Sequence, residues 1–107
     1  MNKQSCPTFS CEIYIAGPLE VAKQILRKEC MREGLCVTIE PTLFIYTGGE
    51  ETGYRVGLLN YPRFPIEDTS TLVDKARNIA LLLLEETYQH SVLLKYNDTT
   101  EWFTKRV

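Results

Sequence analysis

The spacing of apolar residues changes repeatedly along this 107-residue chain, and the order of these spacings is the strongest constraint on its fold. Apolar residues that alternate with polar ones indicate a half-buried strand, whereas recurrence every three or four positions indicates an amphipathic helix. The patterns predict strand, helix, strand, strand, helix and strand over residues 11–16, 19–33, 35–46, 54–61, 70–89 and 92–96. Residues 101–106 form a possible fifth strand. This order is typical of the α+β class.

Turn and capping residues separate these segments. Gly17-Pro18 ends the first strand, and proline is favoured at the first position of a helix. Gly34 predicts a C-terminal helix cap. Residues 47–50, Thr-Gly-Gly-Glu, predict a hairpin turn. Two prolines within residues 61–65 exclude a helix there, because each removes a backbone donor.

Pro41 decides where the second strand lies in the sheet. Residues 35–46 keep their alternation of apolar and polar residues across this proline. Proline has no amide hydrogen to donate to a neighbouring strand, so it is tolerated on an edge strand or at a bulge. The second strand is therefore expected at an edge. The ferredoxin-like split βαβ arrangement (βαββαβ), with sheet order 4-1-3-2 and two helices on one face, satisfies this condition. We expect residues 1–107 to form one such domain.

The charge balance and the cysteines exclude several classes of protein. Twelve Lys and Arg against fourteen Asp and Glu give a formal charge of −2, which argues against a broad grip on a phosphate backbone. Residues 1–10 lack a secretory signal pattern, so we expect a cytoplasmic protein without a membrane span. In that compartment we expect the thiols of Cys6, Cys11, Cys30 and Cys36 to be reduced. Their spacing does not match that of zinc ligands, so we expect neither a metal nor a cofactor.

Alternation also divides the strand residues between two faces of the sheet. The residues expected to face the helices are Ile13, Ile15, Val37, Ile39, Leu43, Ile45, Val56 and Leu58. The opposite, open face collects Tyr14, Cys36, Thr38, Phe44, Tyr46, Arg55, Leu59 and Tyr61. Exposed patches of Tyr, Phe and Leu are usually covered by protein, so this face predicts a partner interface or a homodimer contact. Alternatively, the fifth strand or the first ten residues fold over part of it.

Residues 13–19, Ile-Tyr-Ile-Ala-Gly-Pro-Leu, resemble the first-strand motif of RNA-recognition-motif domains. The resemblance implies that Tyr14 stacks on a base. On the third strand, Val56 and Leu59 replace the outer aromatic residues of that family. The alternative function is therefore a binder of single-stranded RNA or a nucleotide through the aromatic open face, although the chain lacks the usual basic excess.

No motif for catalysis is present. The chain has no nucleophile elbow, no phosphate-binding glycine loop and no paired metal-binding histidines. Its one histidine, His90, follows the second predicted helix, where an imidazole commonly caps the last carbonyl groups. We therefore expect no catalytic residues and no enzymatic activity.

The segment Asn60–Pro65 is the strongest candidate for a recognition element, because its prolines restrict a loop that carries tyrosine, arginine and phenylalanine. The segments 13–18 and 54–65 give the chain an overall similarity to small accessory proteins encoded by phages. This resemblance implies a non-enzymatic protein that binds and blocks a host defence component in the host cytoplasm, as anti-CRISPR proteins do. The predicted partner-binding residues are Tyr14, Phe44, Tyr46, Arg55, Tyr61, Arg63 and Phe64.

Overall fold

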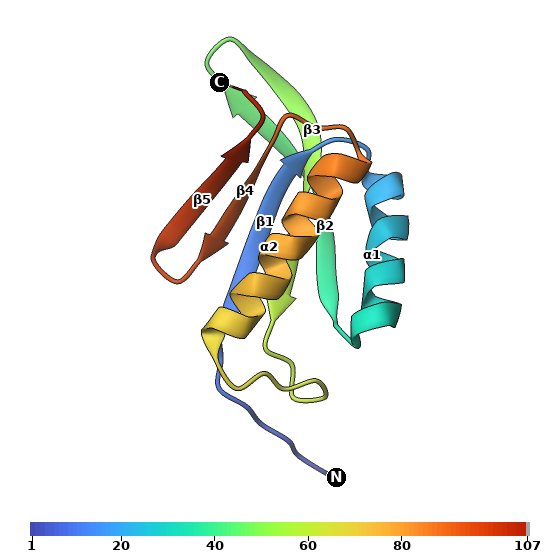
Figure 1. The fold of residues 1–107 in the computed structure, drawn as a ribbon, viewed down its shortest axis with the longest axis vertical. Coiled ribbons are helices and arrows are strands. Elements are labelled where there is room, and N and C mark those ends of the chain that lie inside the picture. Colours follow the sequence, from blue (N-terminus) through green and yellow to red (C-terminus); the bar gives the residue numbers. More distant parts are fainter. Residues whose placement is uncertain (107) are drawn as a thin grey trace.

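The computed structural model describes residues 1–106 and contains one five-stranded antiparallel sheet with two helices packed on one face (Figure 1). The strand order is β2-β3-β1-β4-β5. The elements are β1 (Ser10–Ala16), α1 (Leu19–Glu33), β2 (Val37–Tyr46), β3 (Gly49–Leu59), α2 (Thr69–Glu86), β4 (Ser91–Tyr96) and β5 (Thr99–Thr104).

The α+β class and the order of the first four strands are confirmed. Pro41 lies on β2, which pairs only with β3 at one edge of the sheet. The possible fifth strand is β5, which pairs with β4 and forms the other edge. β5 therefore extends the sheet and does not fold back over its open face.

The core lies between the sheet and the helices. Ile13 and Ile15 of β1 and Val56 of β3 are almost fully buried. Both helices bury small and branched residues against them, as their sequence period predicts. The helical part of the core consists of Ala22, Leu26, Leu72, Val73, Ala76, Ile79, Ala80, Leu83 and Leu84.

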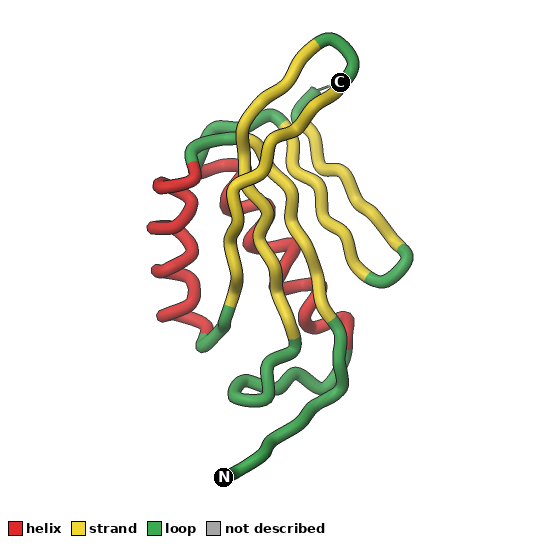
Figure 2. The backbone as a smooth tube through the Cα atoms, turned by 180° about the vertical axis from the view of Figure 1, so that it is seen from behind, coloured by secondary structure: helices red, strands yellow, loops and turns green. Residues whose placement is uncertain are grey.

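Two predicted core residues are exposed. Leu43 retains 49% of its accessible surface and Ile45 retains 75%. The reason is the length of the β2–β3 hairpin: β3 begins at Gly49, five residues earlier than the sequence indicates, and the hairpin tip extends beyond both helices (Figures 1 and 2). The helices therefore cover only the first half of β2.

The second helix also differs from its prediction. α2 ends at Glu86, three residues before the predicted end, because Tyr88 adopts a left-handed conformation with φ of 56°. Its N-terminus is capped by Asp68, whose carboxylate accepts a hydrogen bond from the Thr71 amide at 2.8 Å. Within residues 1–106, neither helix is both long and apolar enough to cross a bilayer.

Candidate functional site

A hollow of about 480 Å³ lies on the sheet face that the helices leave open. Five segments form it: the tip of the β2–β3 hairpin, the end of β1, the turn before β4, the start of β4 and the end of β5. Its volume is within the range of about 300–1,000 Å³ that is typical of small-molecule sites. We call it the aromatic hollow; its lining residues are Tyr14, Ile15, Ala16, Phe44, Tyr46, Glu51, Gln89, His90, Ser91, Val92, Leu93, Trp102 and Arg106.

The aromatic side chains come from both edges of the sheet. Phe44 lies on edge strand β2, and its ring packs against Gly53, where an added Cβ would lie 2.6 Å from the ring. Trp102 lies on the opposite edge strand, β5, with 60% of its surface exposed. Tyr14 lies between them on β1. The rings therefore surround a space that remains accessible from solvent.

Three ionisable side chains also line the aromatic hollow: Glu51, His90 and Arg106. Glu51 is directly opposite Phe44 in the β2–β3 register, so both side chains lie on the open face. Within residues 1–106, none of the three makes an ion pair or a side-chain hydrogen bond. The hollow thus offers a carboxylate, a guanidinium and an imidazole to a ligand.

The adjacent part of the same face has the opposite character. Arg55 lies between Glu40 and Glu12, hydrogen bonds to Glu40 and lies 3.7 Å from Glu12, while Lys95 lies 4.0 Å from Glu12. We call these four residues the charge ladder, since they alternate in sign across β2, β3, β1 and β4. Its cations are neutralised by its anions. The ladder therefore leaves little positive charge for a nucleic-acid backbone.

Tyr14 connects the charge ladder with the aromatic hollow. Its ring lines the hollow, and its hydroxyl donates a 2.6 Å hydrogen bond to the Glu12 carboxylate. This bond to an anion raises the pKa of Tyr14 above its ordinary value, with a smaller contribution from burial. At neutral pH the residue is therefore a fixed, uncharged donor whose ring faces the hollow.

The seven predicted partner-binding residues are spread along the open sheet face and the loop beyond it, and Tyr61 lines a second hollow together with Arg55. Tyr14, Phe44 and Tyr46 line the aromatic hollow, and Arg55 belongs to the charge ladder. The other three lie at the opposite end of the sheet, in the loop that joins β3 to α2 (Figure 1). There the rings of Tyr61 and Phe64 stack with centroids 6.3 Å apart, and the Arg63 guanidinium lies 5.6 Å from the Phe64 centroid.

The rigidity of that loop has a local structural explanation. The side chain of Asn60 is buried; it donates hydrogen bonds to the carbonyls of Pro7 and Ile66 and accepts one from the Ile66 amide. This amide joins the N-terminal segment to the start and end of the loop. The loop is therefore held by the fold itself, and its order alone does not indicate a recognition element.

Four lining residues with ring or charged side chains were not predicted from the sequence. Glu51 and Trp102 belong to strands whose pairing places them on the open face, and Arg106 follows β5. His90 was expected to cap α2. The helix ends at Glu86, four residues before His90, and the His90 side chain lines the hollow instead. Extending the alternation of β4 to the fifth strand would have placed Trp102 opposite Leu93 on this face.

Comparison with known proteins gives a consistent picture of the fold. No protein-family model and no curated protein matches the chain. Two solved structures do match. A phage SAM lyase in complex with S-methyl-5'-thioadenosine has a TM-score of 0.70 and 16% identity, over 97% of this chain and 95% of that chain. A phage SAM lyase in the apo state has a TM-score of 0.69 and 18% identity, over 100% and 97%.

These similarities correct the function expected from the sequence. At 16–18% identity the likeness is one of fold, and both matched structures are of a lyase, which is an enzyme. The expectation of a non-enzymatic, anti-CRISPR-like inhibitor that binds protein is therefore wrong. The coarser resemblance to small phage-encoded accessory proteins agrees with the phage origin of both neighbours. None of the five separate segments that form the hollow contains a catalytic motif, so the sequence alone did not indicate an enzyme.

Proposed function

We propose that this protein is an enzyme that cleaves S-adenosylmethionine (SAM) at a carbon–sulfur bond and releases S-methyl-5'-thioadenosine from the aromatic hollow. One observation carries the proposal: a hollow of ligand size, whose charged side chains have no ion-pair partner within residues 1–106, occurs in a chain that matches the fold of a phage SAM lyase over 97% of its length. The bound S-methyl-5'-thioadenosine of that neighbour is SAM without its four-carbon amino-acid substituent.

The residues of the hollow fit the chemistry of this substrate. Exposed aromatic rings such as Trp102 stack on an adenine base. Ring faces and the Glu51 carboxylate attract a sulfonium cation. The guanidinium of Arg106 suits the substrate carboxylate, since arginine matches the two oxygens of a carboxylate in a bidentate geometry. The substrate would thus be oriented by three different interactions.

The main contribution of the protein to this reaction is to orient the substrate. Sulfonium sulfur is already a good leaving group, and the electron pair of the broken bond converts it to a neutral thioether. The bond breaks as the carboxylate oxygen of the same substituent attacks the carbon bonded to sulfur, so the four-carbon fragment leaves as a closed lactone and no proton has to be transferred. Holding the substrate in the reactive conformation lowers the barrier without any external reactant. The neutral hydroxyl of Tyr14 adds a fixed dipole at one wall.

Two finer structural expectations belong with this proposal. We propose that the first four strands and both helices form a ferredoxin-like split βαβ unit with β5 added at one edge, which the strand order supports. Self-association as a homodimer stays a prediction. Leu43 and Ile45, on the exposed side of the hairpin tip, supply apolar surface for such a contact.

Incubation of the purified protein with SAM, followed by chromatography and mass spectrometry, tests the proposed activity. We expect S-methyl-5'-thioadenosine to accumulate as SAM disappears. Trp102→Leu should reduce the rate, whereas Phe64→Leu, an aromatic substitution at the far end of the sheet, should not. SAM that stays intact in the presence of the folded wild-type protein would rule out the proposed activity.

A further inference from the structure

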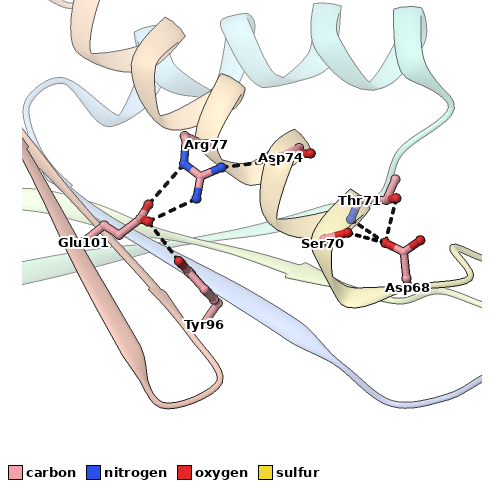
Figure 3. A network of polar contacts seen from close by, with 7 residues as sticks. All are labelled: Asp68, Ser70, Thr71, Asp74, Arg77, Tyr96 and Glu101. Atoms are coloured by element: carbon pink, nitrogen blue, oxygen red, sulfur yellow. Dashed lines mark hydrogen bonds and ion pairs between the residues drawn. The ribbon is translucent and has the colours of Figure 1, made fainter.

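The edge strand β5 is held to the helical layer by a group of polar side chains (Figure 3). Arg77 of α2 donates two hydrogen bonds of 3.1 Å to the Glu101 carboxylate of β5, through Nε and Nη2. Tyr96 of β4 donates a third, of 2.8 Å, to the same carboxylate. These three residues, the Glu101 network, join α2, β4 and β5. Such bidentate pairs with arginine fix orientation as well as distance.

The network lies one residue away from a wall of the aromatic hollow. Successive side chains of a strand point to opposite faces, so Glu101 faces the helices while Trp102 faces the hollow. The pairing agrees: Glu101 is opposite Leu94, which is buried in the core, and Trp102 is opposite Leu93, which lines the hollow. Any change in the position of the Glu101 backbone therefore moves Trp102.

Besides this network, β5 is held on the helical side by Phe103, a partly buried residue that packs against the core. The strand pairs with β4 on one side and has no partner strand on the other. The other ion pair from this end of the chain to α2, between Lys105 and Glu85, is 3.5 Å long, and 70% of the Glu85 side chain is exposed. Exposed pairs of this kind contribute little order. By contrast, less than a third of the Arg77 and Glu101 side chains is exposed.

We propose that Arg77, Glu101 and Tyr96 are positioning residues for ligand binding: from the helical side of the sheet, they hold β5 so that Trp102 stacks on an adenosine-type ligand in the aromatic hollow. The ligand class rests on the proposed function, whereas the ordering of β5 and Trp102 by the Glu101 network does not. Within residues 1–106, the network makes no hydrogen bond or ion pair with a residue of the hollow lining, so it acts on Trp102 through the backbone of β5.

The chain contains one tryptophan, so intrinsic fluorescence reports on Trp102 alone. We expect Glu101→Gln, which removes the charge of the acceptor, to lower the fluorescence anisotropy of Trp102 and to increase its quenching by acrylamide. We also expect the dissociation constant for S-methyl-5'-thioadenosine to rise about 3- to 10-fold. Asp74→Asn is the matched control, because Asp74 pairs with the same arginine at 3.0 Å but does not contact β5; it should change neither property.

The outcomes separate this proposal from the proposed function. Unchanged anisotropy and affinity in Glu101→Gln would overturn the positioning role. Failure of the wild-type protein to bind S-methyl-5'-thioadenosine would overturn the ligand class, whereas the anisotropy would still decide whether the network orders Trp102. If Glu101→Gln unfolds, Tyr96→Phe decides, since it removes one hydrogen bond and keeps the ion pair. We expect Tyr96→Phe to lower the anisotropy of Trp102 below that of the wild type, but not to that of a freely mobile tryptophan. An anisotropy equal to that of the wild type would overturn the positioning role.

Discussion

The charge ladder and the aromatic hollow occupy the same face of the same sheet, yet they use their charged residues in opposite ways. Arg55 and Lys95 in the ladder have carboxylates within 4.0 Å, while Glu51 and Arg106 in the hollow have no ion-pair partner in residues 1–106. Because the charged groups of the ladder are paired with one another, they attract a charged ligand only weakly. On this face, exposure and residue type do not distinguish the two regions, whereas the pairing of the charged side chains does.

Backbone packing separates the two regions as well. At Gly53, beside the hollow, an added Cβ would meet the Ile15 carbonyl oxygen at 2.3 Å and the Phe44 ring at 2.6 Å. At Gly57, beside the ladder, it would meet the Thr38 hydroxyl at 2.5 Å. A threonine side chain can change rotamer, whereas the β1 backbone cannot withdraw without breaking its pairing. The wall of the hollow is therefore less tolerant of substitution than the ladder.

The largest expected effect follows from this contrast. Gly53→Ala should destabilise the protein by about 3 kcal/mol through overpacking and displace Phe44 from the hollow, whereas Gly57→Ala should cost less than about 1 kcal/mol. Urea denaturation of both variants gives the two free energies of unfolding. Equal values would mean that the two glycines are under the same constraint and would remove this part of the contrast.

The next effect concerns binding. Trp102→Leu should weaken the binding of S-methyl-5'-thioadenosine by about 10- to 100-fold, because stacking a base on an aromatic ring contributes about 1–3 kcal/mol. Tyr88→Leu is a suitable control, since Tyr88 is an 87% exposed aromatic residue that does not line the hollow. Calorimetry measures both affinities. A comparable loss in the control would show that the ligand does not select the hollow.

Sequence patterns account for much of the fold because local rules decide it. Alternation identified the face of β1, Gly34 ends α1 in the left-handed conformation expected of a C-terminal cap, and Pro41 indicated an edge strand. Leu43 and Ile45 were misplaced because alternation assigns a face but does not say how far the helices extend over it.

The site was only partly predictable. Tyr14, Phe44 and Tyr46 follow from alternation on strands that were recognised, and all three line the hollow. Hairpin register places Glu51 opposite Phe44 and Trp102 opposite Leu93, but the two hairpins come together only through the pairing of β1 with β3 and β4, which no local pattern encodes. A hollow built from five segments also has no linear motif that the sequence could reveal.

A smaller effect is expected at Tyr14, where ladder and hollow meet. Its pKa is raised from 10.0, so the stability that its bond to Glu12 contributes is present below the ordinary pKa and is lost as pH rises through the raised value. Glu12→Gln should return one late-titrating tyrosine to the ordinary range. Spectrophotometric titration of tyrosinate measures this. An unchanged alkaline titration curve would mean that Glu12 does not set the pKa of Tyr14.

The smallest effect is expected within the ladder itself. Arg55→Met removes the central cation, but its ion pairs are partly exposed, and pairs of this kind contribute little to folding. We expect a urea midpoint close to that of the wild type and unchanged affinity for S-methyl-5'-thioadenosine. A loss of affinity as large as that of Trp102→Leu would contradict the assignment of the ladder as a region outside the site.

The most direct test is to map the binding surface by two-dimensional amide NMR during titration with S-methyl-5'-thioadenosine. The predicted result is a saturable set of shifts at the hairpin tip, the start of β4 and the end of β5, with the amides of Glu40 and Arg55 and of the loop around Phe64 unchanged. Shifts centred on the charge ladder or on that loop, or no shifts at all, would contradict the identification of the aromatic hollow as the ligand site.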